Sequence, residues 1–140
     1  MSAEENKLLL DRLFEGMNQG DFSEFDELIG PDYVNHSFPT PVSGPEAVKM
    51  TLGMFLNAFP DMEMTVEDII AEGNRVASRG FFVGTHEGEF NGIPATGRRV
   101  KVDFSDIWVV NNGQLAENWA QLDIMGMMQQ LGVIPGPEDH

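Results

Sequence analysis

Two acidic residues lie within apolar segments near the C-terminal end of the chain, where ionised groups are unusual. Asp123 stands between Leu122 and Ile124, and Asp106 lies two residues before Trp108. Burying an ionised carboxylate without a partner costs several kcal/mol or raises its pKa. Such a residue is therefore paired, located at the end of a helix or strand, or placed in a pocket. A pocket carboxyl group with a raised pKa can act as a general acid or base near neutral pH.

A hairpin predicted between these acids determines which face each of them occupies. Asn112-Gly113 is the strongest turn signal of the chain, because Asn-Gly tolerates the positive φ angles of a two-residue turn. If Asn111 pairs with Gln114, Asp106 lies opposite Trp119, and directly paired residues share one face of the sheet. This face would be an aromatic wall with polar groups, as in a small-molecule pocket, unless a one-residue slip inverts it. Its predicted members are Phe104, Asp106, Trp108, Trp119, Gln121 and Asp123.

Each of these residues also has a simpler structural interpretation. Asp is a common helix N-cap, and Asp123 stands where the predicted strand gives way to the helical segment IMGMMQQL. A surface ion pair is a further alternative. A carboxylate held by backbone amides has a lowered pKa and is a poorer base, so capping and catalysis compete. For Asp106 the alternative is an exposed edge position, and for Trp108 and Trp119 it is a place in the core.

The histidines and the remaining motifs do not indicate a cofactor. His36 follows Tyr33 and Asn35 at the end of a short extended segment, and His86 closes a strand in GTHEG; histidines in such places are usually structural. The chain has no cysteine, which removes thiolate nucleophiles and cysteine-ligated metals. It contains no metal-binding histidine spacing, P-loop or dinucleotide fingerprint. The sequence therefore predicts neither a metal nor a nucleotide cofactor.

The charge balance limits the partners of the protein. The 140 residues include 23 acids and only eight Lys and Arg, for a net charge of −15. Nucleic acid and anionic membranes are poor partners, because binding phosphate needs basic clusters. No apolar run approaches the roughly 20 residues that a bilayer requires, and MSAEENKLLL lacks the basic start of a signal peptide. A cytoplasmic protein is expected, in keeping with the missing cysteines.

The elements that would position these residues are helices followed by antiparallel hairpins. Apolar residues at helical spacing predict helices over 4–17, 22–30, 43–59 and about 123–132. A period of two predicts strands over 62–72, 75–85, 99–110 and 115–123, after a short extended segment over 32–36. The Gly- and Pro-rich segment 86–97 is expected to be a loop. This order predicts one α+β domain over residues 1–140, with a curved sheet and a flexible tail over 133–140.

Five segments of the chain share the patterns of a known protein group. They are YVNH (33–36), GPEAVK (44–49), FPDMEMTVEDIIAEGNRVASR (59–79), GTHEGEFNGIPATGRRV (84–100) and NGQLAENWAQLDIMGMMQQLG (112–132). Together they resemble the SnoaL-like polyketide cyclase group of the nuclear transport factor 2-like superfamily, over nearly the whole chain. GTHxGxFxGIPATG combined with the closing E-x-W-x-x-x-D and QLG is fairly specific to that group.

The resemblance implies a fold and a reaction. The fold is a cone-shaped α+β barrel whose helices close a pocket, associated as a homodimer or homotetramer through the sheet. The reaction needs no cofactor: a proton next to a carbonyl is removed, and a polyketide ester closes a ring by an intramolecular aldol step. The family's general acid/base aspartate falls on Asp123, and a second polar position falls near Asp106. The expected partner is a small hydrophobic or polyketide-like molecule.

The predicted site joins these residues to the neighbouring polar and aromatic side chains. Its predicted catalytic residues are Asp123, Asp106 and His36. The predicted substrate contacts are Asn35, Tyr33, His86, Trp119, Gln121, Phe104, Trp108 and Arg79. Among them, Asn35, His86 and Gln121, together with His36, could donate hydrogen bonds to an enolate.

Two other functions fit the same fold, because fold alone does not determine function. A limonene-type epoxide hydrolase would use Arg79, Asp106 and Asp123 to activate water, although the close Arg-x-Asp spacing of those enzymes is missing. A non-catalytic binder of a small hydrophobic molecule is the other. A helix-capping Asp123 would favour the binder, whereas an Asp123 carboxylate pointing freely into an apolar cavity would favour an enzyme.

Overall fold

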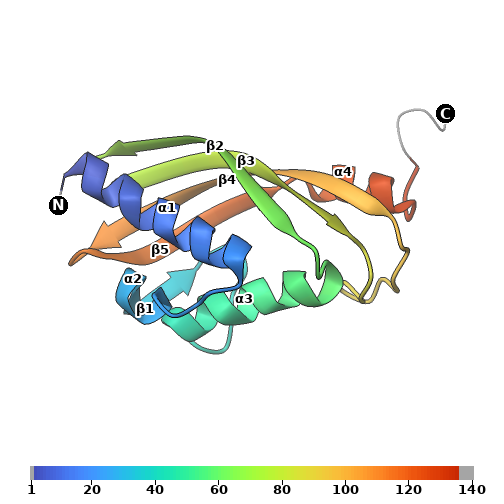
Figure 1. The fold of residues 1–140 in the computed structure, drawn as a ribbon, viewed down its shortest axis with the longest axis horizontal. Helices are drawn as coiled ribbons and strands as arrows, with labels where there is room; N and C mark the ends of the chain where they lie inside the picture. The colour runs from blue at the N-terminus through green and yellow to red at the C-terminus, as the bar shows by residue number, and fades with distance from the viewer. Residues whose placement is uncertain (1, 136–140) are drawn as a thin grey trace.

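A curved, open sheet of five strands arches over helices that lie against its inner face (Figure 1). The structure is a computed structural model that describes residues 2–135. The strands are β1 (Ile29–Asn35), β2 (Glu63–Glu72), β3 (Arg75–Thr85), β4 (Arg99–Asn111) and β5 (Gln114–Leu122). Their spatial order is β1-β5-β4-β3-β2, with β1 parallel to β5 and the other neighbours antiparallel. The predicted α+β class is confirmed.

The helices of the described chain are α1 (Ala3–Gln19), α2 (Phe25–Leu28), α3 (Pro45–Ala58) and α4 (Ile124–Leu131). A capping box between Ser2 and Glu5 begins α1, and Gly20, with a φ of 68°, ends it. Pro45 occupies the first turn of α3, where its missing N–H costs nothing. The second helix is shorter than predicted, because the chain already extends into β1 at Ile29.

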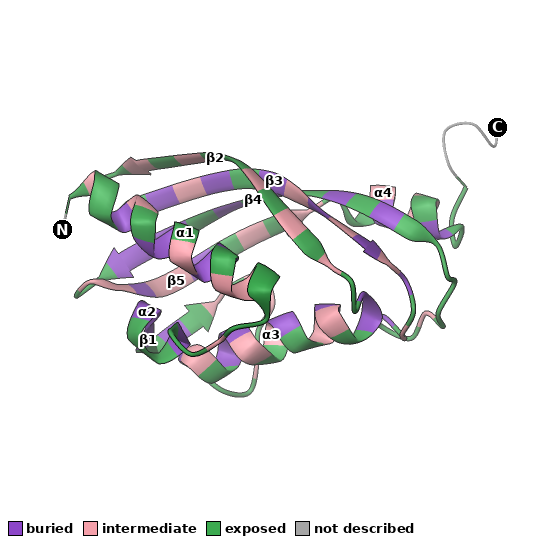
Figure 2. Cartoon of the chain, viewed as in Figure 1, coloured by how far each residue is buried: buried purple, intermediate pink, exposed green. Residues whose placement is uncertain are grey.

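The core lies between the inner face of the sheet and the helices. In β4, alternate residues point into this core. Phe104 and Trp108 of β4 are buried, whereas Lys101 is exposed, as the period of two requires. Figure 2 shows buried and exposed residues along the strands of the sheet. Leu10 and Leu13 of α1 are fully buried against this layer. Each such side chain contributes about 1.5–3 kcal/mol to folding. The inner face of β4 therefore belongs to the same core as α1, where the Phe14 and Phe104 ring centroids are 5.9 Å apart.

A β-bulge in β5 changes the register that the turn alone predicts. Pairing begins at the predicted turn but then skips Ala116, so that Asp106 lies opposite Ala120 instead of Trp119. The extra residue inverts the faces of the remainder of β5. The inner face of β5 carries Asn118, Ala120 and Leu122, all of which line the interior. The prediction that one face carries both acids and Trp119 is therefore wrong, because Trp119, Gln121 and Asp123 lie on the other side.

The remaining segments agree with the predicted order. Residues 86–97 form a loop apart from an isolated bridge between Phe90 and Ile93. Of the tail predicted over 133–140, residues 133–135 are exposed after Gly132 ends α4, and residues 136–140 lie outside the described part. No helix within residues 2–135 is both long and apolar enough to cross a membrane.

Candidate active site

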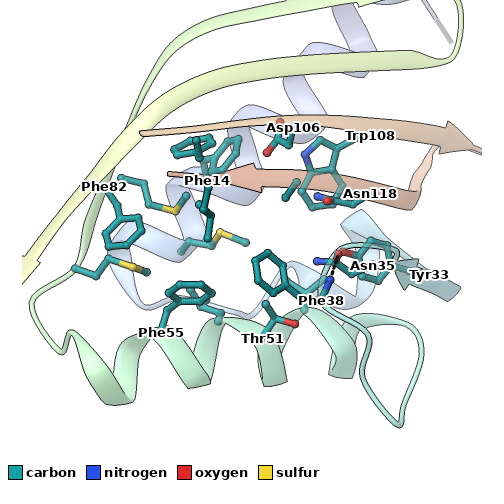
Figure 3. Close-up of a pocket in the computed structure, with 18 residues that line it drawn as sticks. Phe14, Tyr33, Asn35, Phe38, Thr51, Phe55, Phe82, Asp106, Trp108 and Asn118 are labelled. Carbon is teal, nitrogen blue, oxygen red and sulfur yellow. Dashed lines mark hydrogen bonds between the residues drawn. The ribbon is translucent and has the colours of Figure 1, made fainter. Parts of the chain in front are cut away.

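A cavity of about 110 Å³ lies between the inner face of the sheet and helices α1 and α3. Aromatic, methionine and aliphatic side chains form most of its wall (Figure 3). The aromatic residues of the wall include Phe14, Tyr33, Phe38, Phe55, Phe104 and Trp108. A concave apolar surface with a few polar groups is the usual makeup of a small-molecule site.

Asp106 is the only acidic residue among the described residues that line this cavity. β4 directs its side chain inward, and the residue is 8% exposed. The hydroxyl group of Ser78, on the neighbouring strand β3, donates a hydrogen bond to Oδ1 of Asp106. Burial raises the pKa of this carboxyl group, while the Ser78 hydrogen bond and the indole N–H of Trp108 act in the opposite sense. No Lys, Arg or His lines the described cavity wall to compensate for the charge.

Three buried polar atoms on the cavity wall have no hydrogen-bond partner in the described structure. They are the Thr51 hydroxyl of α3, the Trp108 indole nitrogen of β4 and the Asn118 side-chain oxygen of β5. Trp108 and Asn118 are direct cross-strand neighbours. Because buried polar groups are nearly always paired, such unpaired atoms indicate a place for a ligand or water.

Ala120 determines how much room the Asp106 carboxyl group has. It is the direct cross-strand neighbour of Asp106 and lines the same cavity. Because its side chain is a single methyl group, it fills little of the space beside the carboxyl group. The Asp106 carboxyl group therefore borders the apolar cavity on the side of Ala120 and accepts a hydrogen bond from the Ser78 hydroxyl on β3.

Tyr33 and Asn35, both predicted substrate contacts, line the cavity from the end of β1. The Tyr33 ring stacks on Trp108, with ring centroids 5.9 Å apart. Burial raises the pKa of the Tyr33 hydroxyl, and the neighbouring Asn35 side chain opposes this. Oδ1 of Asn35 accepts hydrogen bonds of 2.9 Å from the backbone N–H groups of Ser37 and Phe38. This turn holds Phe38 in the cavity wall.

His36 and Trp119, predicted to belong to the site, lie together outside the cavity. Their rings stack with centroids 4.6 Å apart, and Nε2 of His36 is 3.0 Å from Oε1 of Glu117. Arg75 lies over the Trp119 ring, at 5.9 Å from its centroid. Trp119 is 37% exposed on the outer face of the sheet. The structure therefore brings neither residue to Asp106.

Asp123 is the N-cap of α4 and does not line the cavity. Its Oδ1 accepts a 2.9 Å hydrogen bond from the backbone N–H of Gly126, and the residue is exposed. Gln121 is exposed beside it on the outer face. The capping interpretation of Asp123 is correct, and the prediction that its carboxylate faces the pocket is wrong. The cause is the skipped residue in β5, which the sequence pattern does not reveal.

Arg79 and His86 also lie away from the cavity. Nε of Arg79 forms an ion pair of 2.5 Å with Asp68 on exposed parts of β3 and β2. Arg79, Asp106 and Asp123 are therefore not assembled as an epoxide hydrolase would require. His86 is fully buried, and its Nδ1 accepts a 3.2 Å hydrogen bond from the backbone N–H of Thr96, which holds the loop after β3. In the described residues, no cluster of His, Cys, Asp or Glu is arranged to hold a metal.

The residues nearest to Asp106 and the unpaired polar groups were not predicted as site residues from the sequence. They are Thr51, Asn118 and Ala120 of the cavity wall, and Ser78, which bonds to Asp106. Thr51 follows Ala47 by one helical turn, so the apolar stripe of α3 could have indicated it. Ser78 pairs with Asp106 across β3 and β4, but the long loop between those strands leaves their register open.

Comparisons with known proteins agree with this fold. The model of the SnoaL-like polyketide cyclase family matches residues 7–131. The chain is 28% identical to nogalonic acid methyl ester cyclase of Streptomyces nogalater, over 91% of this chain and 97% of that protein. It is 30% identical to the aklanonic acid methyl ester cyclase DauD of Streptomyces sp. strain C5, over 89% and 80%. The crystal structure of IdmH from Streptomyces antibioticus superposes with a TM-score of 0.78 at 33% identity, over 91% and 98%. The chain belongs to the SnoaL-like polyketide cyclase family.

Proposed function

We propose that this protein is a polyketide cyclase-type enzyme in which Asp106 is the general acid and base. The observation that carries the proposal is a single carboxyl group, buried in an apolar cavity, with a raised pKa and no cation on the described cavity wall. Such a carboxylate is a stronger base than a solvated one, because the site favours its protonated form. The relatives are named as cyclases of nogalonic and aklanonic acid methyl esters, and the family as polyketide cyclases, which supports an uncharged polyketide-like substrate.

The proposed reaction has two proton transfers that involve the same residue. The ionised carboxyl group of Asp106 removes a proton from the carbon next to a carbonyl group. The resulting enolate carbon attacks a second carbonyl carbon of the same molecule and forms the ring bond. The new alkoxide then takes the proton back from Asp106. The product is an isomer of the substrate, so the reaction needs no oxidant, reductant or added cofactor.

A non-catalytic binder is the competing function, and the capping of Asp123 was expected to favour it. Asp106, in place of Asp123, puts a carboxyl group into the cavity, and this supports an enzyme over a binder. The test is incubation of the purified protein with nogalonic or aklanonic acid methyl ester, in buffer without added cofactor, followed by chromatography of the products. An enzyme forms the ring-closed isomer. A protein that binds these esters and returns them unchanged is a binder.

We also propose that two copies associate through the outer face of the sheet. An apolar row crosses four strands there, from Ile70 through Ala77 and Ile107 to Trp119. Ile70 and Ile107 are 67% and 44% exposed, which is unusual for isoleucine on a sheet. Light scattering should give twice the 15.5 kDa chain mass, and Ile107→Lys should halve it. Met125→Lys on exposed α4 is the matched control; a monomeric wild-type protein would contradict the proposal.

A further inference from the structure

We infer that the indole N–H of Trp108 is a catalytic hydrogen-bond donor, which binds the carbonyl oxygen next to the carbon that Asp106 deprotonates. This inference rests on the proposed function of Asp106. Trp108 would be a second residue that contacts the reacting group. The ligand would be an apolar molecule whose carbonyl oxygen lies next to β4.

The first observation is the unpaired state of the indole nitrogen. Trp108 is 4% exposed, and its Nε1 has no hydrogen-bond partner in the described structure. A buried donor without an acceptor is unfavourable, so its usual fate is pairing with protein, water or ligand. Trp108 faces the cavity, and its indole N–H lowers the pKa of Asp106 without a hydrogen bond of normal geometry to that carboxyl group. The N–H is therefore left to donate to a molecule inside the cavity beside Asp106.

The second observation is the position of this nitrogen relative to Asp106. The two residues are separated by one position on β4 and project from the same face of the strand. Figure 3 shows the indole nitrogen on the side of the ring that faces the Asp106 carboxyl group. Ser78 already occupies Oδ1 of Asp106, which leaves the other carboxyl oxygen for a ligand. The free donor and the free carboxyl oxygen therefore face the same part of the cavity.

The third observation is that the indole ring is held in place. Tyr33 stacks on it at 5.9 Å with an angle of 20° between the ring planes. Asn118 lies directly opposite on β5, and its unpaired side-chain oxygen can accept a hydrogen bond from a hydroxyl group of a ligand. A donor that is fixed before the reaction needs no reorganisation when charge develops.

These features match the charge change of the proposed reaction. When Asp106 removes the proton, the negative charge moves onto the carbonyl oxygen and forms an enolate. The hydrogen bond from Trp108 becomes stronger at that moment, so it stabilises the transition state more than the bound ketone. No Lys, Arg or His of the described residues lines the cavity to do this. Loss of one such donor typically reduces kcat by about 10²–10³-fold.

The test uses 2-acetylnaphthalene as a probe and 2-ethylnaphthalene, which lacks the carbonyl oxygen, as its matched control. The chain has two tryptophans, so a ¹H–¹⁵N spectrum contains two indole signals, from Trp108 in the cavity and Trp119 on the outer face. The ketone should move the Trp108 proton downfield relative to the hydrocarbon and leave Trp119 unchanged. An equal effect of both compounds, or failure of the ketone to bind, would overturn the inference.

The same probe separates this inference from the proposed function. Enolisation of the ketone in D₂O replaces its methyl protons with deuterium, which NMR follows over time. Trp108→Phe, which keeps an aromatic ring, should slow this exchange about 100-fold, while Trp119→Phe should not change it. Exchange that depends on Asp106 but is unaffected by Trp108→Phe overturns the Trp108 inference alone. No exchange with the wild-type protein, together with no turnover of the polyketide esters, overturns the proposed function.

Discussion

Replacing Asp106 with Asn should stabilise the folded protein at neutral pH. Burial raises the pKa of the Asp106 carboxyl group, and no cation on the described cavity wall compensates for its charge. Asn has nearly the same shape and keeps a side-chain oxygen that can accept the hydrogen bond from Ser78. The substitution therefore removes the buried charge and preserves the packing around it.

The sign and size of this effect follow from the linkage of proton binding to folding. The carboxyl group of Asp in an unfolded chain has a pKa of about 3.9. The folded-state pKa is higher, so the folded protein holds the proton more tightly, and ionisation destabilises it. This destabilisation by the ionised Asp106 is absent below the unfolded-state pKa. It grows as the pH rises to the folded-state pKa and is constant above it. One pKa unit corresponds to about 1.4 kcal/mol, or roughly 4 °C in Tm for this chain length.

Urea unfolding of the wild type and of Asp106→Asn between pH 4 and 8 measures this difference. The variant should exceed the wild type by about 1 kcal/mol or more at pH 7, and the difference should shrink toward pH 4. Asp123→Asn is the control, because that carboxylate is exposed and Asn caps helices as well as Asp does. An Asp106→Asn protein that is no more stable at pH 7, or a gain that does not depend on pH, would refute the reasoning.

Three further substitutions test the neighbours of Asp106 and the helix cap. Ser78→Ala removes the hydrogen bond that lowers the pKa of Asp106, so the acidic limb of kcat/KM against pH should move to higher pH; an unchanged profile would argue against Asp106 as the base. Ala120→Leu fills space beside Asp106 and should raise the Kd for 2-acetylnaphthalene about tenfold, or by ~1.4 kcal/mol, in a fluorescence titration. Asp123→Ala removes the cap of α4 and should cost about 1 kcal/mol in urea unfolding, with turnover unchanged.

The helices and the strand faces near the site were predictable where one residue pattern determined them. The stripe of leucines in α1 and the alternation along β4 each bury one face, and both elements form as predicted. The predicted inward direction of Asp106 agrees with its place in the cavity, because it depends only on the alternation with Phe104 and Trp108. Its chemical role stays a prediction.

The face of β5 was not predictable, because one skipped residue decides it. The turn residues of the β4–β5 hairpin fix where pairing begins, but Ala116 carries no signal for a bulge. Regular pairing from the turn placed Trp119 on the inner face, whereas Asn118 and Ala120 occupy it. A shift of one residue therefore removed three of the six residues predicted for the inner face of this hairpin: Trp119, Gln121 and Asp123.

Asp106, rather than Asp123, is the residue on which the proposed function depends, and one comparison of rates tests this most directly. The initial rate of ring closure of nogalonic acid methyl ester is measured at pH 7 for the wild type, Asp106→Asn and Asp123→Asn. The two variants carry the same chemical change, one inside the cavity and one at the cap of α4. We predict a loss of about 10²–10⁴-fold for Asp106→Asn and an unchanged rate for Asp123→Asn. Full activity of Asp106→Asn, or loss of activity only in Asp123→Asn, would contradict the account.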